Sequence, residues 1–116
     1  MLEKPVFVQG IFAFEGQGLD HPVSFPKPAT YAVPSDKRAQ TVYLRAGNAS
    51  AEMICLVLTR GGQPMRYFPI GAKGSIHVAL AVLEDLTPGS KIEILVAAPK
   101  GTASTAILDV GFMEIA

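Results

Sequence analysis

Residues 41–59 read TVYLRAGNASAEMICLVLT, and this stretch indicates the fold class. Its first part alternates strictly, which predicts a strand with Val42, Leu44 and Ala46 on the buried face. A turn at Gly47 follows. The second part is apolar at nearly every position, which is typical of a central strand that is covered on both faces. Two neighbouring strands of this kind predict a protein built from packed β-sheets.

The same two-residue periodicity continues along the chain in both directions. It predicts further strands at 6–14, 23–25, 29–33, 65–70, 75–82, 91–97 and 104–115. Hairpin loops are expected at Arg60–Gln63, where consecutive glycines allow positive φ angles, and at Gly71–Ser75. One short helical turn is expected over 83–89, ended by a type II turn at Pro88-Gly89. Eight or nine strands predict an all-β fold, a two-sheet antiparallel β-sandwich of jelly-roll or immunoglobulin-like (Ig-like) topology.

The first forty residues differ in composition from the rest. Five of the nine prolines and four of the six phenylalanines fall before residue 35. Proline cannot donate a hydrogen bond to a β-ladder, so this Pro-rich N-terminal segment is expected to hold edge strands or an extended arm. We therefore expect a single β-sandwich domain over 1–116, with a Pro/Phe-rich arm and edge strands in 1–40 and the core strands in 41–116.

The charge and hydropathy of the chain indicate which kinds of partner it can bind. Charged residues make up 17% of the 116 residues, against about 25% in an ordinary domain, and the mean hydropathy is +0.33. A small domain normally carries a charged surface, so these values favour apolar surface that is buried against another chain. Ten basic and ten acidic residues cancel, which argues against a nucleic-acid partner. No run of 18 apolar residues is present, so no membrane segment is expected.

The chain start and its single cysteine indicate a compartment. Residues 1–5 lack the apolar stretch of a signal peptide. One cysteine cannot form an internal disulfide, which fits synthesis in a reducing compartment. We expect a protein that is made in the cytoplasm, and that ends in a virion if it assembles into one. Asn48-Ala49-Ser50 matches a glycosylation acceptor, but without secretion it is interpreted as a turn.

Few side chains in this sequence are candidates for catalysis or metal binding. His77 is a single histidine within a strand, expected on the face opposite Ile76 and Val78, and Asp20-His21 has no third metal ligand nearby in sequence. Cys55 falls inside the most hydrophobic strand, where a thiol behaves as a small apolar side chain. Glu84-Asp85 are adjacent rather than placed across a cleft, as a glycosidase pair would be. The sequence predicts no catalytic residue, no metal site and no cofactor, and hence no enzyme.

The stretch Ile70-Gly71-Ala72-Lys73-Gly74-Ser75-Ile76-His77-Val78 is similar to a segment of the small β-sandwich transducers of microbial sensory rhodopsins. The similarity covers only this short stretch, so no site residue is carried over from that family. It keeps a signalling or ligand-binding module open as an alternative.

The features together favour a non-enzymatic structural or assembly protein, such as a viral capsid decoration (cement) protein or another virion component that stabilises neighbouring subunits. Its partners are expected to be proteins, namely further copies of itself or a larger assembly such as a capsid. The candidate partner interface consists of Phe7, Phe12, Phe14, Phe25 and Tyr31. The alternative is a β-sandwich binding module for a carbohydrate, a small ligand or a signalling partner.

The carbohydrate alternative depends on aromatic side chains. Tyr43, Tyr67 and Tyr31 are candidates for a platform on which sugar rings stack. The chain has no tryptophan, and tyrosines at half-exposed strand positions are common. The interpretation as a structural or assembly protein therefore explains more features of the sequence than the carbohydrate alternative does.

Overall fold

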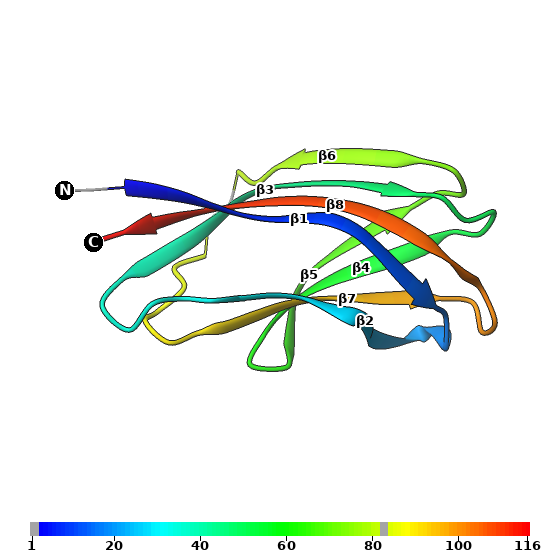
Figure 1. The fold of residues 1–116 in the computed structure, drawn as a ribbon, viewed down its shortest axis with the longest axis horizontal. Helices are drawn as coiled ribbons and strands as arrows, with labels where there is room; N and C mark the ends of the chain where they lie inside the picture. Colours follow the sequence, from blue (N-terminus) through cyan, green and yellow to red (C-terminus); the bar gives the residue numbers. More distant parts are fainter. Residues whose placement is uncertain (1–2, 82–83) are drawn as a thin grey trace.

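Residues 3–81 and 84–116, which the computed structural model describes, form eight strands in two layers (Figure 1). The strands are β1 (Glu3–Glu15), β2 (Gly18–Ala32), β3 (Arg38–Asn48), β4 (Ile54–Arg60), β5 (Gln63–Ile70), β6 (Ser75–Ala79), β7 (Lys91–Ala98) and β8 (Ala103–Ile115). They make two antiparallel four-stranded sheets, with orders β1-β8-β3-β6 and β2-β7-β4-β5. The predicted all-β sandwich is confirmed.

The strand order identifies the sandwich as a jelly roll. β1 pairs with β8, β2 with β7, β3 with β6 and β4 with β5, so the chain resembles one long hairpin whose strand pairs fall alternately into the two sheets. This nested pairing is the topology of a jelly roll and not that of an immunoglobulin sandwich. As a result the N-terminal and C-terminal strands lie side by side (Figure 1).

The core fills the space between the two sheets. Leu44 and Leu108 of one sheet and Leu56 and Ile94 of the other are essentially inaccessible to solvent. β4 lies between β7 and β5, as its two apolar faces predict. β1 and β2 are outermost in their sheets, which agrees with the proline content of this region, because an edge strand needs fewer ladder donors.

The prediction for β3 was wrong in part. Thr41 is buried while Val42 is only half-buried, although Leu44 and Ala46 point inward as expected. The register against β8 shifts between Thr41 and Tyr43, which marks a β-bulge. A bulge inserts one residue and exchanges the two faces of the strand on either side of it.

Two connections also differ from the prediction. The Gly71–Ser75 loop joins β5 to β6, which lie in different sheets, so it is a crossover and not a hairpin loop. Residue 83 lies outside the described residues, and 84–89 contain no helical turn, because Leu86 pairs with Ala39 as an isolated bridge. Pro88-Gly89 does form a turn, with Gly89 at φ +79° and the Ser90 amide donating to the Thr87 carbonyl at 3.1 Å.

The hairpin between β4 and β5 is confirmed. Gly61 and Gly62 at its tip have φ angles of +57° and +82°. Two successive positive φ angles are typical of the type I′ turn, whose twist matches the strands on either side.

Candidate interaction surface

The outer face of the β1-β8-β3-β6 sheet carries three rows of side chains that cross all four strands. The registers between neighbouring strands fix these rows, and alternate residues of each strand point outward. The aromatic row is Phe7, Gly111, Tyr43 and Ala79. The charged row is Gln9, Asp109, Arg45 and His77. The isoleucine row is Ile11, Ile107, Gly47 and Ser75.

The charged row is centred on the Asp109 carboxylate. Its Oδ1 atom accepts hydrogen bonds from the Gln9 amide at 3.0 Å and from the Tyr43 hydroxyl at 2.8 Å. These hydrogen bonds hold the pKa of Asp109 below its ordinary value, so the carboxylate is ionised at neutral pH. Arg45 lies further away, with its Nη1 atom 3.6 Å from Asp109 Oδ2, and its side chain is 59% exposed. More than half of the Arg45 side chain is therefore accessible to solvent.

The aromatic row depends on a glycine. The Tyr43 ring lies directly over Gly111, and a Cβ atom at position 111 would come within 2.1 Å of the ring. The ring therefore lies close to the sheet, and its hydroxyl can reach Asp109. On its other side the ring meets His77 edge-on, with the centroids 6.1 Å apart. Burial and the neighbouring Asp109 raise the pKa of Tyr43, so the hydroxyl remains a donor.

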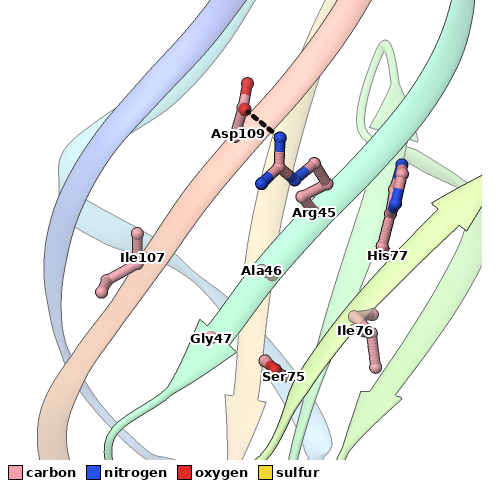
Figure 2. A pocket seen from close by; sticks show the side chains of 8 residues that line it. All are labelled: Arg45, Ala46, Gly47, Ser75, Ile76, His77, Ile107 and Asp109. Carbon is pink, nitrogen blue, oxygen red and sulfur yellow. Dashed lines mark ion pairs between the residues drawn. The ribbon is translucent and has the colours of Figure 1, made fainter.

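The isoleucine row makes the face uneven. Ile11 and Ile107 are 66% and 56% exposed, and Phe7 in the aromatic row is 51% exposed. We call these three side chains, which belong to β1 and β8, the apolar ridge. Beside it, over β3 and β6, Gly47 and Ser75 leave a hollow of about 540 Å³ (Figure 2). Its walls are Arg45, His77, Ile107 and Asp109 (Figure 2).

The outer face of the second sheet is different in character. It carries a second hollow of about 490 Å³ over β2, β7 and β4, lined by Thr30, Thr59, Lys91 and Glu93 among others. The Thr59 hydroxyl donates to the Glu93 carbonyl at 3.0 Å. Tyr67, which is 63% exposed, lies on β5 at the edge of this sheet.

The five residues of the predicted interface occupy different environments. Phe12, Phe14 and Phe25 lie in the core, where the ring of Phe25 is 5.4 Å from Phe12 and 6.4 Å from Phe14. Tyr31 lies between the sheets, 4.5 Å from the Phe112 ring. Phe7 alone of the five is on the outer face. A partner interface at these positions stays a prediction, and Phe7 is the side chain that can carry it.

The three tyrosines of the carbohydrate alternative do not converge. Tyr43 lies on the outer face of the first sheet, Tyr67 on that of the second, and Tyr31 between the sheets. The Tyr31 hydroxyl donates to the Glu114 carboxylate at 2.6 Å, and burial raises the pKa of Tyr31. The tyrosine that has polar neighbours on the surface is Tyr43.

The remaining candidates fit a structural interpretation. His77 points away from Ile76 and Val78, as expected, and lines the hollow. Cys55 is half-buried, and burial raises the pKa of its thiol. The Asn48 side-chain amide is buried and donates to the backbone carbonyls of Glu52, Ile70 and Gly71, so it joins the β3–β4 connection to the end of β5.

The described part of the chain shows neither a metal site nor a membrane-spanning helix. Residues 3–81 and 84–116 hold no group of three or more His, Cys, Asp and Glu side chains with the geometry of a metal site. Asp20 and His21 are both exposed, near the start of β2. Over the same residues, no helix has the length and hydrophobicity required to cross a bilayer.

Sequence reasoning missed most of the outer face. Gln9, Arg45 and Asp109 are separated by up to 100 residues, and only the register between β1, β8 and β3 brings them into one row. The alternation within each strand does indicate that these polar residues point away from the core. It gives no information on which strands are neighbours.

No protein-family model matches this chain, and no curated protein matches its sequence significantly. Solved structures match its fold. The CBM36-1 domain of a multidomain xylanase from the hindgut metagenome of Trinervitermes trinervoides aligns with a TM-score of 0.59 and 17% identity, over 97% of this chain and 98% of that domain. A family 35 carbohydrate binding module from Clostridium thermocellum aligns with a TM-score of 0.52 and 12% identity, over 94% and 97% of the two chains.

A viral protein has a similar fold. A chain of infectious bursal disease virus, Gx strain, aligns with a TM-score of 0.55 and 9% identity, over 97% of this chain and 31% of the viral chain. At such identities the similarity establishes the β-sandwich fold alone. The structural neighbours thus include carbohydrate-binding modules and a viral protein.

Proposed function

We propose that this protein is a non-enzymatic structural protein that assembles with other protein subunits through the outer face of the β1-β8-β3-β6 sheet. The observation that carries the proposal is the apolar ridge of Phe7, Ile11 and Ile107, three large side chains that are each more than half exposed on adjacent strands. Large apolar side chains that are exposed together on one face of a small domain favour a protein–protein contact. Covering the exposed parts of these side chains contributes about 1 kcal/mol or more for each.

The other features of the chain support a subunit of a larger assembly. Its charged fraction of 17% and mean hydropathy of +0.33 fit a surface that is covered by protein. Its formal net charge of zero gives no reason to expect a nucleic-acid partner. We propose that the assembly is a virion, in which the protein decorates the capsid or bridges neighbouring subunits after synthesis in the cytoplasm. The fold that it shares with a viral protein supports this proposal.

A second candidate is a carbohydrate-binding module, which the charged row favours. Tyr43 offers a partly exposed ring beside the hollow, while Asp109, Arg45 and His77 supply donors and acceptors for hydroxyl groups. Two of the structural neighbours are carbohydrate-binding modules. The exposed side chains of Phe7 and Ile11 have no role in this alternative, so the assembly function ranks first.

Photo-crosslinking separates the two functions. A photoreactive phenylalanine analogue is placed at Phe7 on the ridge and, as a control, at Tyr67 on the opposite sheet. If the proposal holds, position 7 crosslinks to a protein subunit that mass spectrometry identifies, in particles or extracts from the source of the protein, and position 67 does not. Absence of protein crosslinks at position 7, together with binding to a polysaccharide array that is lost in Tyr43→Ala, would replace it with the carbohydrate function.

A further inference from the structure

We propose that the partner of the outer face of the β1-β8-β3-β6 sheet is a second copy of this chain, an inference that rests on the assembly function above. The two copies pack face to face about a two-fold axis that is parallel to the strands and runs between β8 and β3. A rotation of 180° about this axis places β8 of one copy over β3 of the other, and β1 over β6. Each of the three rows then meets the same row of the second copy in reversed order.

The sizes of the side chains are complementary in this arrangement. In the isoleucine row, Ile107 faces Gly47 of the second copy and Ile11 faces Ser75, so the ridge of each copy enters the hollow of the other. In the aromatic row, Phe7 faces Ala79, while the Tyr43 ring, which covers Gly111 of its own copy, faces the Tyr43 ring of the second copy. In the isoleucine row each large side chain is therefore matched with a small one, and in the aromatic row the two tyrosine rings meet at the two-fold axis.

The charges are complementary as well. Asp109 of each copy faces Arg45 of the other, and the two-fold axis brings four charges of alternating sign together. Within one chain Arg45 lies 3.6 Å from Asp109 and is 59% exposed, so its guanidinium group is available to a second carboxylate. Hydrogen bonds from Gln9 and Tyr43 already hold the carboxylate in place. A face with charges of one sign would repel its own copy, whereas this one attracts it.

The area predicts the strength of the pairing. Four strands about 4.8 Å apart and the short β6 strand at about 3.3 Å per residue give a footprint of about 19 by 17 Å. This footprint amounts to about 650 Å² for the two copies together, which is about half of the 1,200 Å² at the lower end of stable interfaces. We therefore expect a concentration-dependent dimer with a dissociation constant in the micromolar range or weaker.

A charge exchange tests the two-fold arrangement. Asp109→Lys places two lysines beside two arginines, and Arg45→Glu places four carboxylates together, so each variant alone is expected to dimerise at least tenfold more weakly. An equimolar mixture of the two variants restores both ion pairs in a mixed dimer and recovers most of the affinity. The measurement is sedimentation equilibrium over a concentration series, with circular dichroism to verify the fold.

Gly47→Leu is a second variant that does not depend on charge. A Cβ atom at position 47 would have its nearest neighbour, Ile107 Cβ, at 4.0 Å, so the added side chain begins without a clash and extends over the hollow. The leucine fills the hollow that Ile107 of the second copy occupies, and dimerisation is expected to weaken at least tenfold. Tyr67→Ala, which removes a larger exposed side chain from the other sheet, is the matched control and should leave the association unchanged.

The results distinguish this inference from the assembly function. Association that is weakened in both charge variants, recovered in the mixture and blocked by Gly47→Leu supports the two-fold dimer. Association that the charge variants do not weaken, or that the mixture does not recover, overturns the arrangement. A wild-type protein that stays monomeric at millimolar concentration overturns the choice of partner, and crosslinking of position 7 to a different subunit would then still support the assembly function.

Discussion

Gly111→Ala is the substitution whose effect the structure fixes most closely. The added Cβ atom would lie 2.1 Å from Tyr43 Cε2, 2.7 Å from Cδ2 and 2.8 Å from Cζ, so the whole ring must move. No positive φ is involved at this position, and the effect is therefore steric. Displacing the ring breaks the 2.8 Å hydrogen bond from the Tyr43 hydroxyl to Asp109.

The magnitude follows from these contacts. A hydrogen bond to a charged group contributes about 1.5–3 kcal/mol, while a compatible Gly→Ala substitution stabilises by about 0.4–1 kcal/mol through the unfolded chain. The net expectation is a loss of about 1.5 kcal/mol, which lowers the Tm of a domain of this size by about 5–9 °C. Urea and thermal denaturation followed by circular dichroism measure it.

Two controls isolate the ring as the cause. Gly47→Ala adds the same methyl group to the same face, where its nearest neighbour is 4.0 Å away, and should be neutral or slightly stabilising. In a Tyr43→Ala background there is no ring over position 111, so Gly111→Ala should no longer lower the free energy of unfolding. A cost below about 0.5 kcal/mol in the wild type, or the same cost in both backgrounds, would refute the reasoning.

Three further predictions concern the core and the buried polar groups. Deletion of residues 1–28 removes β1 and three core phenylalanines, so it should abolish the cooperative thermal transition; a truncated chain that still unfolds cooperatively would show that these side chains are not essential to the core. Tyr31→Phe removes a hydrogen-bond donor to the buried Glu114 carboxylate. It should lower the free energy of unfolding, measured by urea denaturation, by about 1–3 kcal/mol. Burial raises the pKa of Tyr31 above its ordinary value near 10. Above pH 10 the free energy of unfolding of the wild type should therefore fall more steeply with pH than that of Tyr31→Phe. If the two plots of unfolding free energy against pH run parallel, Tyr31 does not contribute to the pH dependence. The Cys55 thiol, whose pKa burial raises, should react with a disulfide reagent at pH 8 more slowly than free cysteine, and equal rates would contradict its half-buried position.

The fold class could be predicted because alternation and proline positions report local constraints. The two apolar faces of the fourth strand indicate a central position, and the prolines of 5–34 indicate edge strands; both agree with the structure. The position of Val42 could not be predicted in this way, because a bulge exchanges the faces within an unbroken alternation. The burial of Phe12 and Phe14 had a usable signal, since both share the parity of Val6 and Val8 and oppose that of Phe7.

The candidate surface depends on information that is not local. Gln9 lies opposite Asp109, and Ile11 lies opposite Ile107, across separations of about a hundred residues. A slip of β1 by one residue in this register would turn Phe7 and Ile11 inward and Phe12 and Phe14 outward, so the core selects the register. The core pattern thus determines which outward residues become neighbours, although it contains none of them.

The jelly-roll topology adds a constraint on when the proposed interface exists. β8 lies between β1 and β3, and it supplies Asp109, Ile107 and Gly111 to the three rows. Neither the apolar ridge nor the charge pair of the outer face is complete until the last strand of the chain has joined the sheet. Partly synthesised chains therefore lack the self-complementary surface, and association through this face is restricted to molecules that have already folded.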